Sequence, residues 1–175
     1  ASANLGNLPA APPLFGRALD LDAVEALLRE HAVVSIVGAA GIGKTCLALA
    51  NAARFDAPDG CWWVELAPIN EAAQVPNTIA GVLGIQQPSG RQPPEGLAIA
   101  LASKHLLLVL DNCEHLADDL APLIDSLRER ARNVRLLVTS QESLKCRDEQ
   151  VYRLGALAVP ATVQLEDAAE YGAVA

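Results

Sequence analysis

The chain has no methionine, and aromatic residues make up only 3% of its 175 residues. Because a natural reading frame begins with methionine, we expect the stretch that starts at Ala1 to be a piece of a longer protein. Since aromatic side chains are scarce, Leu, Val, Ile and Ala must fill the interior. A hydrophobic content of 51% is ample for one ordinary core, and this composition is typical of an α/β sheet covered by helices.

Cationic side chains and long apolar runs are also scarce. The 13 Lys and Arg residues are outnumbered by 21 Asp and Glu residues, for a net charge of −8. Nonspecific binding to nucleic acid rests on clustered Lys and Arg, so we expect no direct nucleic-acid contact by this piece. No apolar run approaches the roughly 20 residues that cross a bilayer, and the N-terminus lacks a signal pattern. We therefore predict a cytoplasmic protein without a membrane partner.

The four cysteines show no C-x-x-C spacing, which argues against a redox pair or a structural zinc site. Cys113 and His115 could supply half of a metal site, but a matching second pair is missing. We expect reduced thiols at all four positions, which are Cys46, Cys61, Cys113 and Cys146.

Residues 38–45 read GAAGIGKT, a full match to the P-loop pattern G-x-x-x-x-G-K-[ST]. They follow an apolar run at 32–37 and precede an Ala/Leu-rich stretch at 44–54. Glycine allows successive N–H groups to surround an anion at the start of a helix, although a turn that needs glycine only for tight geometry is the alternative. We predict a polyphosphate site formed by Gly38, Ala39, Ala40, Gly41, Ile42, Gly43, Lys44, Thr45 and Cys46.

Three of the predicted site residues have specific roles. Lys44 would reach the β- and γ-phosphate oxygens, and the Thr45 hydroxyl would be a ligand of Mg²⁺. The apolar run at 105–110 ends in Asp111, as a buried parallel strand would. Ligands of open α/β sheets bind outside the carboxyl ends of the strands, so Asp111 can hold Mg²⁺ directly or through water. A helix N-cap is the alternative role for Asp111.

Strand and helix patterns alternate along the chain, which predicts a parallel, doubly wound sheet. The fold class is thus α/β, a P-loop NTPase three-layer sandwich with a five-stranded, mostly parallel sheet and helices on both faces. Trp62 and Trp63 are neighbours on a strand, so they should pack on opposite faces. Strands are expected at 32–37, 61–66, 105–110, 134–138 and 150–154, helices at 21–30, 44–54, 75–83, 95–103 and 116–130, and a loop at 86–94.

Six segments together resemble the nucleotide-binding domain of the STAND signal-transduction ATPases. They are Phe15-Gly16-Arg17, GAAGIGKT, CWWVELAPI at 61–69, LLLVLDNCEHL at 106–116, VRLLVTSQESL at 134–144 and YRLGALAVP at 152–160. The similarity is greatest to the bacterial AfsR/LuxR-type regulators, which are related to the NB-ARC or AP-ATPase group. It implies a regulatory switch that binds ATP or ADP with Mg²⁺ and hydrolyses ATP slowly.

The resemblance also implies a domain organisation. Residues 1–14 would be a linker or arm, 15–160 the nucleotide-binding domain, and 161–175 the start of a truncated helical lid. The partners would be DNA-binding, lid and sensor domains of the same polypeptide, and the full-length protein would self-associate with ATP. Since the lid helps to close such sites, we expect the isolated chain to bind nucleotide weakly.

The resemblance assigns further residues, with some departures from the family pattern. Phe15, Gly16 and Arg17 would line the adenine pocket, with Ala18 where an acid is common. Asn112 replaces a second acid, and an amide cannot accept a proton, so the general base would be Glu114 or a positioned water. Glu114 could instead only complement a helix dipole.

The segment after the fourth expected strand holds Thr139, Ser140 and Gln141. These residues would lie near the γ-phosphate if that strand sits between the first and the third. Gln141 stands where relatives often carry arginine, so it keeps a hydrogen bond but loses the charge. Thr139 and Ser140 would be neutral sensors or would merely end the strand.

Two other functions stay open. A nucleotide-binding interaction module without hydrolysis would explain Asn112 and Gln141. A P-loop kinase or GTPase is less favoured, because the chain has neither the N-K-x-D motif for guanine nor an arginine-rich lid.

Overall fold

The computed structural model describes residues 6–10, 16–39, 43–86, 90, 93–146 and 148–155. A five-stranded sheet runs through these ranges in the order β2-β3-β4-β1-β5, and all its neighbouring strands are parallel. The strands are β1 (Val33–Val37), β2 (Cys61–Glu65), β3 (Leu107–Asp111), β4 (Arg135–Ser140) and β5 (Glu149–Arg153). The helices are α1 (Ala18–Glu30), α2 (Lys44–Arg54), α3 (Val75–Leu83), α4 (Pro93–Ala100) and α5 (Ala117–Arg130), with short 3₁₀ turns η1 (Ala72–Gln74) and η2 (Glu114–Leu116).

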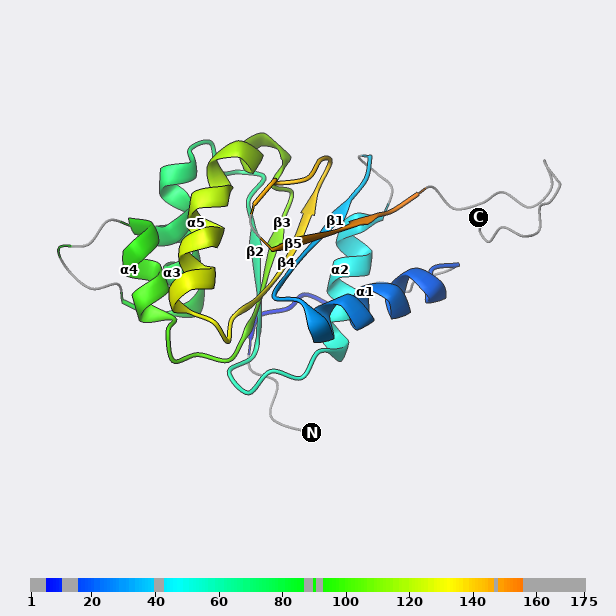
Figure 1. Cartoon of the computed structure of the whole chain (residues 1–175), viewed down its shortest axis with the longest axis horizontal. Coiled ribbons are helices and arrows are strands. Elements are labelled where there is room, and N and C mark those ends of the chain that lie inside the picture. Colours follow the sequence, from blue (N-terminus) through cyan, green and yellow to red (C-terminus); the bar gives the residue numbers. More distant parts are fainter. Residues whose placement is uncertain are drawn as a thin grey trace, which may run out of the picture.

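Helices cover both faces of the sheet, so the predicted three-layer α/β fold is confirmed. Helices α1 and α2 lie on one face, and α3, α4 and α5 lie on the other (Figure 1). Strands β1 and β3 are buried along their whole length, as expected of central parallel strands. Trp62 packs against the core under α3 to α5, and Trp63 packs against the core under α1 and α2. The prediction of opposite faces for the two tryptophans is therefore confirmed.

Several element boundaries differ from the predicted ones. Helix α1 begins three residues early, at Ala18, and α4 begins at Pro93, inside the expected loop. Proline is tolerated in the first turn because the N–H groups there have no partner in the helix. Strand β4 continues through Thr139 and Ser140, because their backbone pairs with Ile36 and Val37 of β1. Because backbone pairing does not depend on side-chain hydrophobicity, the strand continues beyond its last apolar residue, and the apolar pattern placed its end too early.

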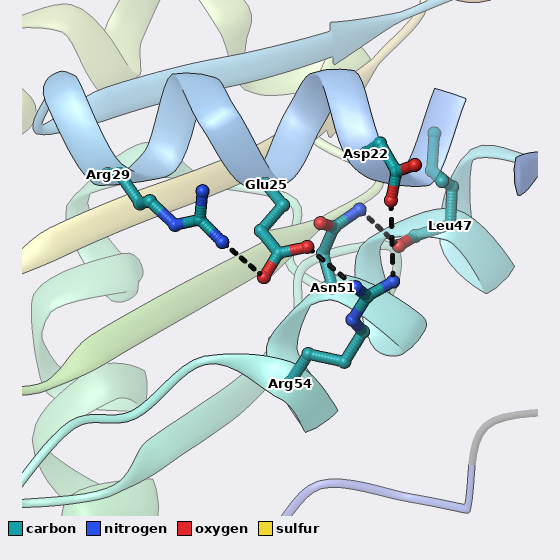
Figure 2. A network of polar contacts seen from close by, with 6 residues as sticks. All are labelled: Asp22, Glu25, Arg29, Leu47, Asn51 and Arg54. Atoms are coloured by element: carbon teal, nitrogen blue, oxygen red, sulfur yellow. Dashed lines mark hydrogen bonds and ion pairs between the residues drawn. The ribbon is translucent and has the colours of Figure 1, made fainter. Parts of the chain in front are cut away.

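Ion pairs fasten α1 to α2 (Figure 2). Arg54 of α2 lies 2.8 Å from Glu25 and 3.8 Å from Asp22, both on α1. Arg29 shares the Glu25 carboxylate at 3.0 Å. Because 45% of the Arg54 side chain is exposed, water screens these pairs, and each contributes less than about 1 kcal/mol.

Residues Gly6 and Asn7 lie beside the edge strand β2. Gly6 forms a parallel bridge with Cys61. The Asn7 amide donates to the Trp63 carbonyl at 3.0 Å, and the Asn7 carbonyl accepts from the Trp63 N–H at 2.6 Å. These two residues therefore satisfy backbone groups that an edge strand leaves open. None of the helices in the described residues has the length and apolarity needed to cross a membrane.

Candidate functional site

The strand order brings the predicted site segments to one edge of the sheet. Strand β4 lies between β1 and β3, which is the condition that the sequence left open. The P-loop begins where β1 ends, and the Gly38 N–H donates to the Ser140 carbonyl at the end of β4, at 3.1 Å. The ends of β1, β3 and β4 thus form one shared edge.

The described part of the P-loop has the backbone that its glycine predicts. Gly43 is the N-cap of α2 and has a φ of 100°, which residues with a Cβ rarely adopt. Lys44 is 7% exposed, and its Nζ donates to the Ala39 carbonyl at 2.8 Å. An ammonium has three donors, and within the described residues only one of them is used, by Ala39. The expected site residues Phe15, Ala40, Gly41 and Ile42 lie outside the described residues.

The Asp111 carboxylate, which is 2% exposed, is held by donors from three segments. Thr45 Oγ1 lies 2.9 and 3.2 Å from its two oxygens. The Thr139 hydroxyl donates to Asp111 Oδ1 at 2.6 Å, and the Asn112 amide donates to Oδ2 at 3.0 Å. Hydrogen bonds from α2, β4 and the residue after β3 therefore fix the carboxylate.

This arrangement fits a magnesium ion. The Thr45 hydroxyl donates its hydrogen bond to Asp111, so the lone pairs of its oxygen point away from Asp111 and can bind a cation. Hydroxyl and carboxylate oxygens are the hard donors that Mg²⁺ prefers. Because the lone pairs of Asp111 face three donors, the carboxylate suits contact through water.

Asn112 has a role that the sequence did not reveal. Its φ of 61° is left-handed, a conformation that asparagine adopts more readily than most residues. Its backbone N–H donates to the Thr139 hydroxyl at 2.9 Å, and its side chain donates to Asp111. From the sequence, Asn112 was recognised only as the replacement of an acid. No sequence pattern indicates that a side chain will turn back and bond to the preceding residue.

A cavity of about 340 Å³ opens beside these groups, lined by residues 43–46 with Asn112, Glu114 and Gln141. Glu114 Oε1 is buried and has no hydrogen-bond partner among the described residues, so it is available as an acceptor. Gln141 is exposed at the rim. Thr139 and Ser140 are 0% exposed and stand behind the cavity wall.

Cys113 and His115 are each engaged with the backbone. The Cys113 thiol donates to the Leu110 carbonyl at 3.3 Å. Burial raises its pKa well above the ordinary value, and the charges of Asp111 and Glu114 raise it further. His115 Nε2 lies 2.7 Å from the Ile69 carbonyl. No cluster of three or more potential ligands among His, Cys, Asp and Glu occurs in the described part of the chain.

Gly16 and Arg17 lie on the other side of β1. Gly16 has a φ of 71°, and Arg17 Nη1 donates to the Gly155 carbonyl at 2.8 Å. The Leu154 N–H in turn donates to the Val37 carbonyl at 2.8 Å. The start of α1 and the end of β5 therefore flank the P-loop opposite Asp111.

The family model described as "NB-ARC domain" matches residues 19–154 of the chain. A Mycobacterium tuberculosis protein named as an HTH-type transcriptional regulator is 34% identical over 136 residues, which are 78% of this chain and 15% of that protein. An uncharacterized Mycobacterium bovis protein is 32% identical over 146 residues, which are 82% of this chain and 37% of that protein. The chain therefore spans only a small part of these relatives.

Two solved structures share the fold. A STAND protein with a tetratricopeptide repeat sensor from Pyrococcus horikoshii aligns with a TM-score of 0.61 and 16% identity, over 85% of this chain and 24% of that one. A Walker-type ATPase of Pyrococcus abyssi aligns with a TM-score of 0.58 and 10% identity, over 84% of this chain and 55% of that one.

Proposed function

This chain belongs to the NB-ARC family, and we propose that it is the Mg-ATP-binding switch domain of a multidomain transcriptional regulator, with slow hydrolysis of ATP to ADP. The observation that carries the proposal is the contact between the Thr45 hydroxyl and Asp111, at 2.9 Å, beside Lys44 and the cavity. A P-loop that faces a buried carboxylate in this way is the arrangement with which P-loop NTPases hold the phosphates and Mg²⁺.

Each group around the cavity would bind a different part of Mg-ATP. P-loop N–H groups and the α2 dipole attract the phosphates, and Lys44 adds a positive charge. Thr45 would hold Mg²⁺, with Asp111 orienting Thr45 and a water ligand. The cation would supply charge neutralisation on the phosphate oxygens. On the other side of β1, Phe15, Gly16 and Arg17 would line the place of the adenine.

Hydrolysis would use Glu114 as the base. Water attacks the γ-phosphorus, the bond to the bridging oxygen of ADP breaks, and the water proton passes to Glu114. Glu114 lines the cavity, and one of its oxygens lacks a partner among the described residues. Gln141 offers a hydrogen bond to the γ-phosphate without a charge, which supports a slow rate.

The proposal extends to the domain organisation of the whole polypeptide. We propose that residues 1–14 are an arm, that 15–160 form the nucleotide-binding domain, and that 161–175 begin a helical lid. DNA-binding and sensor domains of the same polypeptide would be the partners, and ATP would favour self-association in the cytoplasm. The similarity to a protein named as an HTH-type regulator, of which this chain covers 15%, supports a DNA-binding domain elsewhere in a longer polypeptide.

A substitution at Glu114 tests the proposal. We expect Glu114→Gln to keep Mg-ATP binding and to lower turnover by about 100-fold, since general bases contribute on this order. Binding is measured by calorimetry and turnover by phosphate release. Asp118→Asn is the matched control, because Asp118 is an exposed acid in the first turn of α5 and shares any dipole effect. Equal turnover in wild type and Glu114→Gln would contradict the assigned base.

The second candidate is a nucleotide-binding module without hydrolysis. It is favoured by the Asn112 amide, which donates to Asp111 where a second acid could have accepted a proton. ATP binding by the wild type without measurable phosphate release, alone and with the remaining domains, would support this candidate.

A further inference from the structure

A cluster of three side chains joins the first turn of α1 to the carboxyl end of β5. Arg17 Nη1 donates to the Gly155 carbonyl at 2.8 Å and to Asp20 Oδ2 at 3.2 Å. The other Asp20 oxygen accepts a hydrogen bond from the Tyr152 hydroxyl. The side chains of Arg17 and Asp20 are 8% and 25% exposed, so the cluster is largely shielded from water. Asp20 is its centre, since it contacts both other side chains.

The strand order places this cluster on one side of the P-loop and the metal-binding groups on the other. Strand β4 flanks β1 on the side of Asp111, and β5 flanks β1 on the opposite side. Thr45 and Glu114 line the cavity on the Asp111 side. A nucleotide whose terminal phosphate faces these groups extends its nucleoside toward β5 and the start of α1.

We propose that Asp20 and Tyr152 are positioning residues for the nucleoside: they fix Arg17, and with it the Gly16 backbone, on that side of the site. This inference rests on the proposed function. The long side chain of Arg17 has many rotamers. Asp20 is itself held by the Tyr152 hydroxyl, so its hydrogen bond to Arg17 restricts Arg17 to one rotamer. Neither Asp20 nor Tyr152 belongs to the segments assigned to binding.

The protonation of Tyr152 supports this geometry. Burial, the hydrogen bond to Asp20 and the charge of that carboxylate together raise the pKa of the Tyr152 hydroxyl to about 12. The hydroxyl therefore keeps its proton at neutral pH and remains a donor to Asp20.

The alternative is that the cluster only fastens α1 to the sheet. Arg54 gives a matched control, because its ion pairs with Asp22 and Glu25 fasten the same helix to α2 (Figure 2). Those pairs do not include Arg17. Arg54→Gln therefore loosens α1 without changing the cluster.

The test compares Mg-ATP with Mg-tripolyphosphate, which lacks a nucleoside, on the 175-residue chain. For Tyr152→Phe we expect the Kd for ATP to rise about fivefold, the effect of losing one hydrogen bond. The Kd for tripolyphosphate should stay within about twofold of the wild-type value. Asp20→Asn, which keeps an oxygen for Tyr152 but loses the charge facing Arg17, should show the same selective loss even if Tyr152→Phe fails to fold. Arg54→Gln should leave both dissociation constants unchanged.

Three results would overturn the inference: equal weakening of both ligands, an unchanged ATP affinity in the folded variants, or the same selective loss in Arg54→Gln. If the wild-type chain bound neither ligand, the proposed function itself would fail, and this inference with it. The wild-type titration therefore separates the two failures.

Discussion

Asp111 shows how one residue depends on donors that are distant in sequence. Thr45 precedes it by 66 residues, and Thr139 follows it by 28 residues. A carboxylate at 2% exposure is stable only when its oxygens are hydrogen-bonded. The three donors therefore satisfy the buried carboxylate and set the direction in which Asp111 faces Thr45.

The Thr139 hydroxyl is a sensitive member of this network. Thr139→Val keeps the shape but removes a donor to Asp111 and an acceptor for the Asn112 N–H. We expect a loss of about 1–3 kcal/mol in the free energy of unfolding, because the buried Asp111 loses one of its donors and the Asn112 N–H loses its acceptor. Urea unfolding of the variant beside Thr139→Ser, which keeps the hydroxyl, checks this. Equal stability of the valine and serine variants would contradict it.

At the scale of elements, the connection from β4 to β5 is held by Glu149, the first residue of β5. Its carboxylate accepts hydrogen bonds from the Ser143 hydroxyl at 2.7 Å and from the N–H groups of Leu144 and Lys145 at 3.0 and 2.9 Å. Burial by itself raises the pKa of Glu149, but the Ser35 hydroxyl together with these hydrogen bonds outweighs burial and lowers the pKa below its ordinary value. The segment after Gln141 is therefore fixed by a charged group.

The lowered pKa of Glu149 gives a pH prediction. Its stabilising contribution is complete above the unfolded pKa of about 4.3 and is lost as pH falls through the lower folded pKa. Glu149→Gln should thus lower the free energy of unfolding by about 1–2 kcal/mol at pH 7, and this difference should shrink below about pH 4. Denaturant unfolding at several pH values measures it.

Glu142→Gln is the control for Glu149, because Glu142 is an exposed acid in the same connection. We expect its effect on stability to be small at every pH. A difference between Glu149→Gln and wild type that stayed constant down to the acid range would contradict the assigned role.

At the scale of the whole molecule, the site is formed by segments that are distant in the sequence. Cavity residues come from the P-loop and α2, from the segment after β3 and from the segment after β4. The sheet has a separate core on each face, and the site lies at its edge. A ligand that contacts all three segments therefore stabilises the fold as a unit.

Nucleotide should consequently raise the melting temperature of the chain. Binding that is confined to the folded state adds about 2.7 kcal/mol when the free ligand is at 100 times its Kd. We expect this rise only at high Mg-ATP concentration, with a Kd above about 1 μM, since the cavity is open and a lid would add contacts. Asp111→Asn should reduce the rise. A calorimetric titration that gave submicromolar affinity would contradict the expected weak binding.

The sequence alone determined the layers of this protein and the position of its P-loop. Buried parallel strands leave continuous apolar runs, and covering helices leave a 3.6-residue period, so five strands and their helices could be recognised locally. The GAAGIGKT pattern is equally local, because the backbone geometry of a phosphate loop is set by glycines a few residues apart. The boundaries of β4 and α4 were missed, since backbone pairing and a tolerated proline leave no apolar period.

The tertiary structure decided which side chains meet. Only the strand order places β4 between β1 and β3, and this order turns Thr139 toward Asp111 and leaves Gln141 at the cavity rim. The left-handed Asn112 and the contact between Asp20 and Tyr152 likewise join residues through the packed sheet. The physical reason is that a hydrogen bond depends on atoms within about 3 Å, and only the folded chain brings residues distant in sequence that close.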